Sequence, residues 1–191
     1  ASTPVDMYIH DTYFIVGHIH YVVFGGSLFA MFAAIDFWFP KMFGRMLNNW
    51  MGKVHFFVTI VAFNCTFFPM HILGVGGHMR RLYNPMQYDF LQPFQPLNEF
   101  MTVSAVVLGL AQVLLVVNMA WSMKYGRRAE PNPWNANTLE WAVKSPPDHG
   151  NFTESPVVYR GPYEYSVPGI DTDFLPQNLD VSMLESNERP K

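Results

Sequence analysis

Residues 14–40 read FIVGHIHYVVFGGSLFAMFAAIDFWFP, an apolar run that contains a single charged residue, Asp36. About 20 residues of α-helix cross the ~30 Å hydrocarbon layer of a membrane, because each helical residue rises about 1.5 Å. The run is longer than one crossing requires. It predicts a first transmembrane helix over about residues 13–42.

Two more apolar runs follow along the chain. Residues 54–77 and 100–121 contain no Asp, Glu, Lys or Arg, and each run ends at polar or basic residues. They predict transmembrane helices over about residues 50–76 and 97–123. The expected fold class is therefore an all-α membrane protein, with three transmembrane helices in residues 1–124. Residues 125–191 contain most of the 15 prolines and are expected to form an extended polar tail.

Basic residues predict how the three helices are oriented. They gather between residues 41 and 53 and again just after residue 123. Because cytoplasmic loops carry an excess of Lys and Arg, both segments and the C-terminus are expected on the cytoplasmic side, or on the matrix side in a mitochondrion. The expected location is a bacterial or mitochondrial inner membrane, crossed several times and surrounded by lipid.

Composition excludes several other classes. The net charge of −3 and the lack of a basic cluster exclude a nucleic-acid partner. Cys65 is the only cysteine, so no disulfide forms within the chain. The chain opens ASTP without a signal-peptide pattern, and we expect it to be a piece of a longer membrane protein, either a split gene product or a partial chain.

Two histidines, His18 and His20, lie inside the first predicted span. Side chains two residues apart on an α-helix point about 200° away from each other, so this pair cannot readily bind one ion together. A neutral imidazole is a good axial ligand for haem iron, and such a helix could hold one haem on each side. The alternative is a pair of histidines that are hydrogen-bonded to neighbouring helices.

Two further pairs lie at the outer ends of the predicted helices. His10 and Asp11 precede the first span, where a carboxylate beside an imidazole can bind Mg²⁺ or Mn²⁺. Alternatively, Asp11 caps the first helix. Arg80 and Arg81 are the only basic residues of the predicted outer loop, and they indicate anionic partners such as haem propionates. Ordinary solvated arginines are the alternative.

These residues stand in motifs that resemble the carboxy-terminal third of cytochrome c oxidase subunit I, in the haem-copper oxygen reductase family. The resemblance extends to about residue 152. The matching motifs are HDTYF at 10–14, HIHY at 18–21, FFPMH at 67–71, RR at 80–81, NPW at 132–134, TLEW at 138–141 and SPP at 145–147.

The resemblance implies a role for each pair. The three spans correspond to the last three of a twelve-helix bundle. His18 is implied as the axial ligand of the high-spin haem at the catalytic centre, and His20 as an axial ligand of the low-spin haem. Arg80 and Arg81 would bind haem propionates. His10 and Asp11 would hold Mg or Mn at the boundary with subunit II.

The implied function is that of a respiratory cytochrome c oxidase. Electrons would pass from cytochrome c through the low-spin haem to a haem-copper centre that reduces oxygen to water, coupled to proton translocation. The haems are expected to be of the a type. The ligands of copper B would lie outside this chain, in the amino-terminal portion of subunit I, and subunits II and III would be further partners. A membrane dihaem electron carrier and a non-catalytic membrane scaffold are the alternatives.

Overall fold

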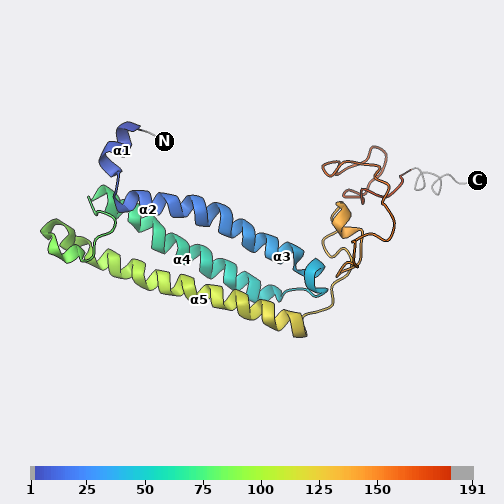
Figure 1. The fold of residues 1–191 in the computed structure, drawn as a ribbon, viewed down its shortest axis with the longest axis horizontal. Helices are drawn as coiled ribbons and strands as arrows, with labels where there is room; N and C mark the ends of the chain where they lie inside the picture. Colours follow the sequence, from blue (N-terminus) through green and yellow to red (C-terminus); the bar gives the residue numbers. More distant parts are fainter. Residues whose placement is uncertain (1–2, 182–191) are drawn as a thin grey trace, which may run out of the picture. The chain divides into compact units, whose positions relative to one another are not determined.

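The computed structural model describes residues 3–181 (Figure 1). The regular elements in that range are helices, without strands, and apart from the 3₁₀ turn η4 (Leu139–Trp141) residues 126–181 are irregular. Three helical stretches are long and apolar enough to cross a membrane: Tyr13–Phe43, Asn49–Val75 and Asp89–Tyr125. The expected all-α class with three membrane-length helices is confirmed. A short helix, α1 (Thr3–Ile9), precedes the first stretch.

The first stretch consists of three segments with different helical geometry. The α-helices α2 (Tyr13–His20) and α3 (Phe29–Phe43) flank a π-helical segment, η1 (Tyr21–Leu28). The hydroxyl of Thr12 caps α2 by accepting a hydrogen bond from the backbone N–H of Phe14 at 3.2 Å. The alternative role of Asp11 as the cap is therefore wrong. Since η1 starts after His20, regular α-helical geometry sets the spacing of His18 and His20.

The second stretch is one helix, α4 (Asn49–Val75). Asn48 caps its start by accepting a hydrogen bond from the N–H of Met51 at 3.1 Å. At its end, Gly77 has φ +84°, and the N–H of His78 donates to the carbonyl of Leu73 at 2.9 Å. This is the six-to-one hydrogen bond of a helix that stops at a glycine in the left-handed conformation. It turns the chain sharply towards the Arg80–Arg81 pair.

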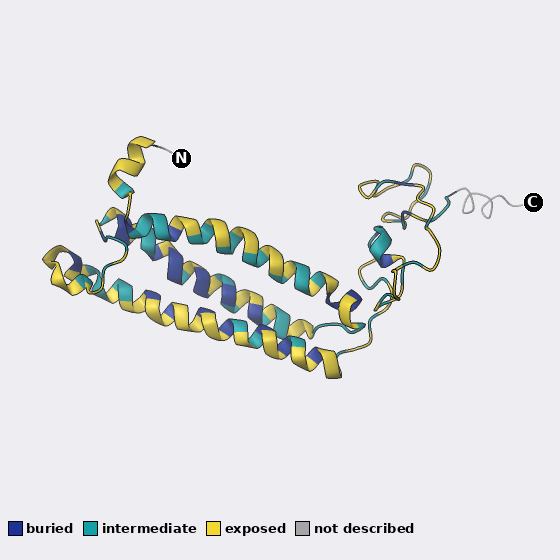
Figure 2. Ribbon diagram, viewed as in Figure 1, coloured by how far each residue is buried: buried dark blue, intermediate teal, exposed yellow. Residues whose placement is uncertain are grey.

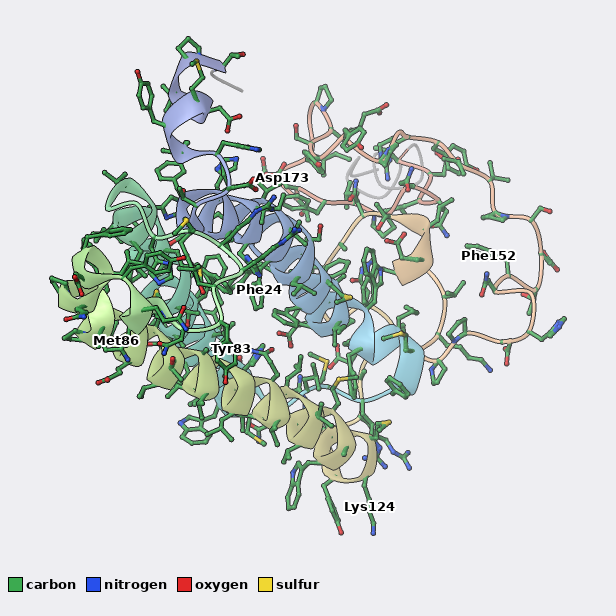
Figure 3. All side chains as sticks on the ribbon, turned by 60° about the vertical axis from the view of Figure 1, so that its left-hand side comes forward. Phe24, Tyr83, Met86, Lys124, Phe152 and Asp173 are labelled. Atoms are coloured by element: carbon green, nitrogen blue, oxygen red, sulfur yellow. The ribbon has the colours of Figure 1, made fainter. Side chains whose placement is uncertain are left out.

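The third stretch begins with a 3₁₀ segment, η3 (Asp89–Phe94), and continues as α5 (Gln95–Tyr125); a shorter 3₁₀ turn, η2 (Pro85–Gln87), precedes it. Lys124, the single basic residue of α5, extends outward from its end (Figure 3).

The chain divides into two compact units, which are described separately. The first comprises Ala1–Ile35 and Asn48–Trp121, and the second comprises Asp36–Leu47 and Ser122–Lys191. The predicted division into membrane helices over 1–124 and a tail over 125–191 stays a prediction.

In the first unit, α4 is the most buried of the three helices (Figure 2). Its Phe63 and Phe67 pack with Leu108 of α5 and with Phe24 of η1 to form an apolar core. A polar contact also joins α4 and α5: Asn118, 1% exposed, accepts from the N–H of Asn48 at 3.1 Å and donates to its carbonyl at 3.1 Å.

The second unit is built around a buried lysine. The ammonium of Lys41 donates to the carbonyls of Pro131 at 3.0 Å and Val143 at 2.7 Å, and it lies 4.9 Å from the ring centroid of Trp141. Lys41 is only 8% exposed, and Trp141 is 2% exposed. These contacts attach residues 131–143 to the last turn of α3.

Further along the tail, the chain folds back on itself where an extended path was expected. The guanidinium of Arg160 donates to the carbonyls of Pro176 and Leu179, while the amide of Gln177 donates to the carbonyl of Arg160 at 2.9 Å. The backbone N–H of Gln177 donates to the carbonyl of Asn137 at 2.9 Å. Side-chain to backbone bonds therefore organise this part of the tail without a helix or a strand.

Candidate functional site

His18 lies on an open side of α2. A groove of about 440 Å³ runs between α1 and α2, and its lining includes Phe14, Ile15 and His18. His18 is exposed, and within residues 3–181 it forms no hydrogen bond or ring contact. An imidazole at this depth of an apolar helix therefore retains both ring nitrogens for a ligand.

His20 lies against α4 instead. Its Nδ1 is 2.7 Å from the carbonyl oxygen of Val16, and its ring stacks on that of Phe67 with centroids 4.3 Å apart and planes 14° apart. A carbonyl only accepts hydrogen bonds, so Nδ1 carries the proton and the neutral ring keeps its lone pair on Nε2. Histidines that bind metals usually have their second nitrogen held in this way.

The structure thus places the two imidazoles in different surroundings. His18 faces the groove beside α1, and His20 packs on Phe67 of α4. This arrangement agrees with the rotation of about 200° between residues two apart on an α-helix. Both residues have an available nitrogen, so both fit axial ligation of two separate groups and neither fits a shared ion.

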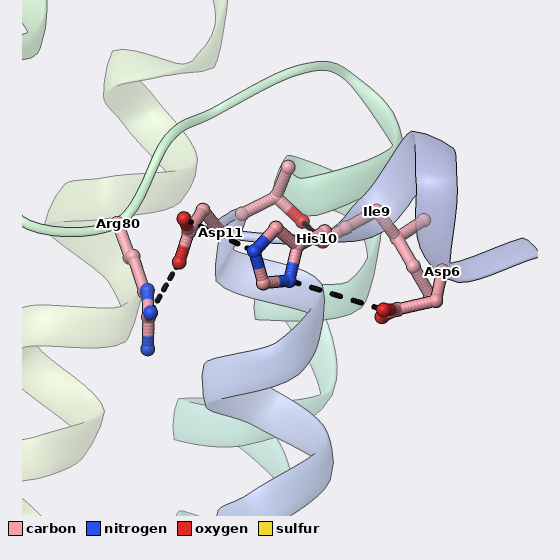
Figure 4. A network of polar contacts seen from close by, with 6 residues as sticks. Asp6, Ile9, His10, Asp11 and Arg80 are labelled. Atoms are coloured by element: carbon pink, nitrogen blue, oxygen red, sulfur yellow. Dashed lines mark hydrogen bonds and ion pairs between the residues drawn. The ribbon is translucent and has the colours of Figure 1, made fainter. Parts of the chain in front are cut away.

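At the N-terminal end of α2, four side chains from α1, the turn between α1 and α2, and the loop after α4 form a polar cluster (Figure 4). His10 Nε2 lies 3.3 Å from Asp11 Oδ2, and His10 Nδ1 lies 3.9 Å from Asp6 Oδ2. The other carboxylate oxygen of Asp11 forms an ion pair with Arg80. The sequence-predicted residues His10, Asp11 and Arg80 are therefore neighbours.

Backbone hydrogen bonds hold the two sides of this cluster together. Thr12 and Met79 form an isolated antiparallel bridge, and the N–H of Arg80 donates to the carbonyl of Asp11 at 2.9 Å. Asp11 and Arg81 have positive φ angles of 57° and 64°. Non-glycine residues in this region are uncommon and often mark functional sites.

The cluster can supply part of a divalent-cation site. Among residues 3–181, no group of three or more His, Cys, Asp or Glu side chains is arranged to hold a metal ion. Mg²⁺, however, usually keeps several waters and takes only one or two carboxylates from a protein. The His10 and Asp11 side chains are 66% and 56% exposed, so a hydrated ion can reach them.

The two arginines differ in their surroundings. Arg80 is paired with Asp11, but its Nε is buried and has no hydrogen-bond partner within the part of the chain that the structure describes. Arg81 is exposed. Arg80 therefore has an unused N–H donor, and the guanidinium of Arg81 beside it is exposed. Together they fit an additional anionic ligand such as a carboxylate.

Sequence reasoning missed two buried polar sites. His78, 2% exposed, lines a cavity of about 360 Å³ together with Tyr13 and Asn98. His55, 5% exposed, is bonded to Gln112 of α5 at 3.2 Å. The signal that could have found them is the presence of an ionisable residue within a predicted span, as for His55, or just after its end, as for His78.

Residues 1–139 match the protein family described as Cytochrome C and Quinol oxidase polypeptide I. Cytochrome c oxidase subunit 1 of Synechocystis sp. is 48% identical over 184 residues, which cover 96% of this chain and 32% of that protein. Cytochrome c oxidase subunit 1 of Thermostichus vulcanus is 44% identical, over 87% of this chain and 29% of that protein.

The alternative cytochrome c oxidase subunit 1 of Bradyrhizobium diazoefficiens is also 44% identical, over 93% of this chain and 31% of that protein. The chain therefore spans less than a third of the length of these relatives. At 96% coverage, the similarity to the Synechocystis protein includes much of the tail after residue 152, where no motif was found in the sequence.

Proposed function

Because the chain belongs to the Cytochrome C and Quinol oxidase polypeptide I family, we propose that it is part of the catalytic subunit of a cytochrome c oxidase. Its proposed role is to hold two haems on opposite sides of α2, with His18 as the axial ligand of the high-spin haem and His20 as an axial ligand of the low-spin haem. The observation that carries this proposal is the pair of imidazoles in one helix, each with an available nitrogen and each in a different environment.

When bound, the low-spin haem supplies electron transfer, and the high-spin haem with a copper ion supplies the reduction of oxygen to water. The chain's own residues orient and stabilise these groups. The carbonyl of Val16 fixes the orientation of the His20 ring and leaves Nε2 for a ligand. Arg80 and Arg81 would bind propionates, and the free Nε of Arg80 supports this role.

His10 and Asp11 are proposed to hold Mg²⁺ or Mn²⁺ with water and a carboxylate from subunit II. Their carboxylate and imidazole donors suit a hard cation that stays partly hydrated. Arg80 occupies one oxygen of Asp11, so the carboxylate would bind the ion through the other.

The proposed setting is the inner membrane of a bacterium, since the three apolar helices need a membrane and the relatives compared are bacterial proteins. Exposed apolar side chains follow one another at intervals of three or four residues along α5, and such a stripe requires lipid or another helix beside it. Its members are Val103, Val106, Leu110, Val113 and Val117.

The amino-terminal portion of subunit I, with the copper ligands, and subunits II and III are the proposed protein partners. Cytochrome c is the proposed donor, because the relatives bear the name cytochrome c oxidase. The C-terminus is proposed to lie on the cytoplasmic side, since Lys124, Arg127 and Arg128 follow the last span. Proton translocation coupled to oxygen reduction is part of the same proposal.

Two substitutions in the intact oxidase test the proposal. His20→Ala should abolish the reduced low-spin haem spectrum, and His18→Ala should abolish carbon monoxide binding at the high-spin haem. His149→Ala, an exposed histidine of the tail, is the matched control and should change neither. Immunoblots must show that each subunit stays in the membrane. An unaltered low-spin spectrum in His20→Ala, or retained carbon monoxide binding in His18→Ala, would remove that histidine from its role.

A further inference from the structure

His78 is a buried ionisable residue at the outer end of α4 that the proposed function does not use. It is 2% exposed and immediately follows the glycine at which α4 ends. Its Nδ1 donates to the carbonyl of Met79 at 3.0 Å, and its Nε2 lies 3.5 Å from Nδ2 of Asn98. Burying an imidazole costs free energy unless the ring is hydrogen-bonded, and the bond to Met79 offsets part of that cost here.

His78 contacts the three membrane-length stretches at one point. Its backbone N–H closes the end of α4 on Leu73, and its ring meets that of Tyr13 of α2 edge to face, with centroids 4.4 Å apart. Its carbonyl accepts the N–H of Tyr13 at 2.9 Å, and Asn98 belongs to α5. The start of α2, the end of α4 and the start of α5 therefore meet at this residue.

The arginine pair begins two residues after His78. The bridge between Thr12 and Met79 and the bond from the N–H of Arg80 to the carbonyl of Asp11 continue the same contact. Backbone hydrogen bonds to residues 11–13 thus hold the chain from His78 to Arg80 against the start of α2. The ring of His78 lies at the start of this contact and adds its own packing on Tyr13.

We infer that His78 is a positioning residue, whose buried ring fixes the arginine-bearing turn, residues 76–81, against the helix that carries His18 and His20. This inference rests on the proposed function, because it assigns the held arginines to the anionic groups of the haems. His78 itself touches no haem in this assignment.

The consequence is electrostatic. A guanidinium near a haem stabilises the more negative, reduced state and so raises the reduction potential. The ring of His78 forms part of the wall of the cavity of about 360 Å³. Without the ring, this cavity grows and the turn loses its ring contact with Tyr13, so the two guanidiniums are held less closely. The potential of the low-spin haem should then fall.

The experiment is a spectroelectrochemical titration of the low-spin haem in the intact oxidase, carrying His78→Ala or His78→Phe. The Ala variant should lower the midpoint potential at an unchanged haem content. The Phe variant keeps a ring against Tyr13 and should restore the potential. His55→Ala removes another buried histidine, 5% exposed, 23 residues earlier in the chain and bonded to Gln112. It should reduce thermal stability without lowering the potential.

An unchanged midpoint in the assembled His78→Ala enzyme, or an equal fall in His55→Ala, would overturn the inference. If His78→Ala does not assemble, His78→Gln is titrated instead, since it keeps an amide beside Asn98 but lacks the ring. The same fall is expected there, and a wild-type potential in that variant overturns the inference too. A wild-type oxidase without haem would refute the proposed function itself, and this would be seen before any variant is compared.

Discussion

The contact between α2 and α4 is closest at Gly74, and this position offers a sharp test of how α2 is held. A Cβ atom added at Gly74 would lie 2.1 Å from the backbone nitrogen and 2.5 Å from the Cβ of Phe14. Non-bonded carbon atoms prefer separations of about 3.5–4.0 Å. The atoms met belong mostly to the backbone of another helix, so rotating a side chain cannot relieve the clash. Gly74→Ala must push α2 away from α4.

The size of the effect follows from the cost of overpacking. Inserting a methyl group into a packed site usually costs about 1–3 kcal/mol. If the clash destabilises the haem-bound state by this amount relative to the haem-free state, the affinity for haem drops about 5–150-fold. Each ~1.4 kcal/mol of binding free energy corresponds to a factor of ten in affinity. Phe14 is one turn before His18, so the high-spin site should lose haem first.

The assay is haem content per subunit in the purified oxidase, measured as pyridine haemochrome during dilution or mild heating. Gly109→Ala is the control, because a Cβ at that position of α5 would meet no atom within 4 Å. Alanine is favoured over glycine in a helix by about 1 kcal/mol, so the control should be neutral or slightly stabilising. Equal haem retention in the two variants would refute the view that Gly74 sets the position of α2.

Two other predictions address the polar contacts. Asp11→Asn should reduce Mn²⁺ incorporation, measured by electron paramagnetic resonance of the purified complex, since a neutral amide replaces the proposed carboxylate ligand; equal occupancy would exclude direct ligation by Asp11. Lys41→Met should leave the carbonyls of Pro131 and Val143 without their buried donor and cost about 1–3 kcal/mol in the attachment of the tail. Limited proteolysis of intact membranes should then cut residues 131–143 faster than in Lys124→Met, and equal cleavage would contradict this role of Lys41.

The membrane helices were predictable because length and hydropathy are local properties of the chain. The apolar runs at 14–40, 54–77 and 100–121 lie within or close to the helical stretches Tyr13–Phe43, Asn49–Val75 and Asp89–Tyr125. The separation of His18 from His20 was also predictable, because two residues of α-helix fix the angle between their side chains.

Contacts between distant residues were not predictable in this way. The ion pair of Asp11 with Arg80 depends on how α4 ends, and the sequence suggested separate roles for these two residues. The fold of the tail depends on Arg160, which binds carbonyls 16 and 19 residues further along the chain. Such bonds leave no hydrophobic periodicity in the sequence. A segment that is held by them therefore has the same sequence pattern as a segment that stays extended.

The distribution of tight contacts along the first stretch bears on how its two histidines are held. In the N-terminal part of the stretch, a Cβ at Gly17 would lie 2.9 Å from Cε1 of His71, and the Thr12–Met79 bridge fixes the start of α2. In η1, by contrast, a Cβ at Gly25 or Gly26 would meet no atom within 4 Å. Regular α-helical geometry therefore ends where the histidines end, although Phe24 of η1 still packs on Phe63 and Phe67 of α4. π-Helical turns often lie beside functional sites, and here the change to π-helical geometry comes directly after His20, so it leaves the angle between His18 and His20 unchanged.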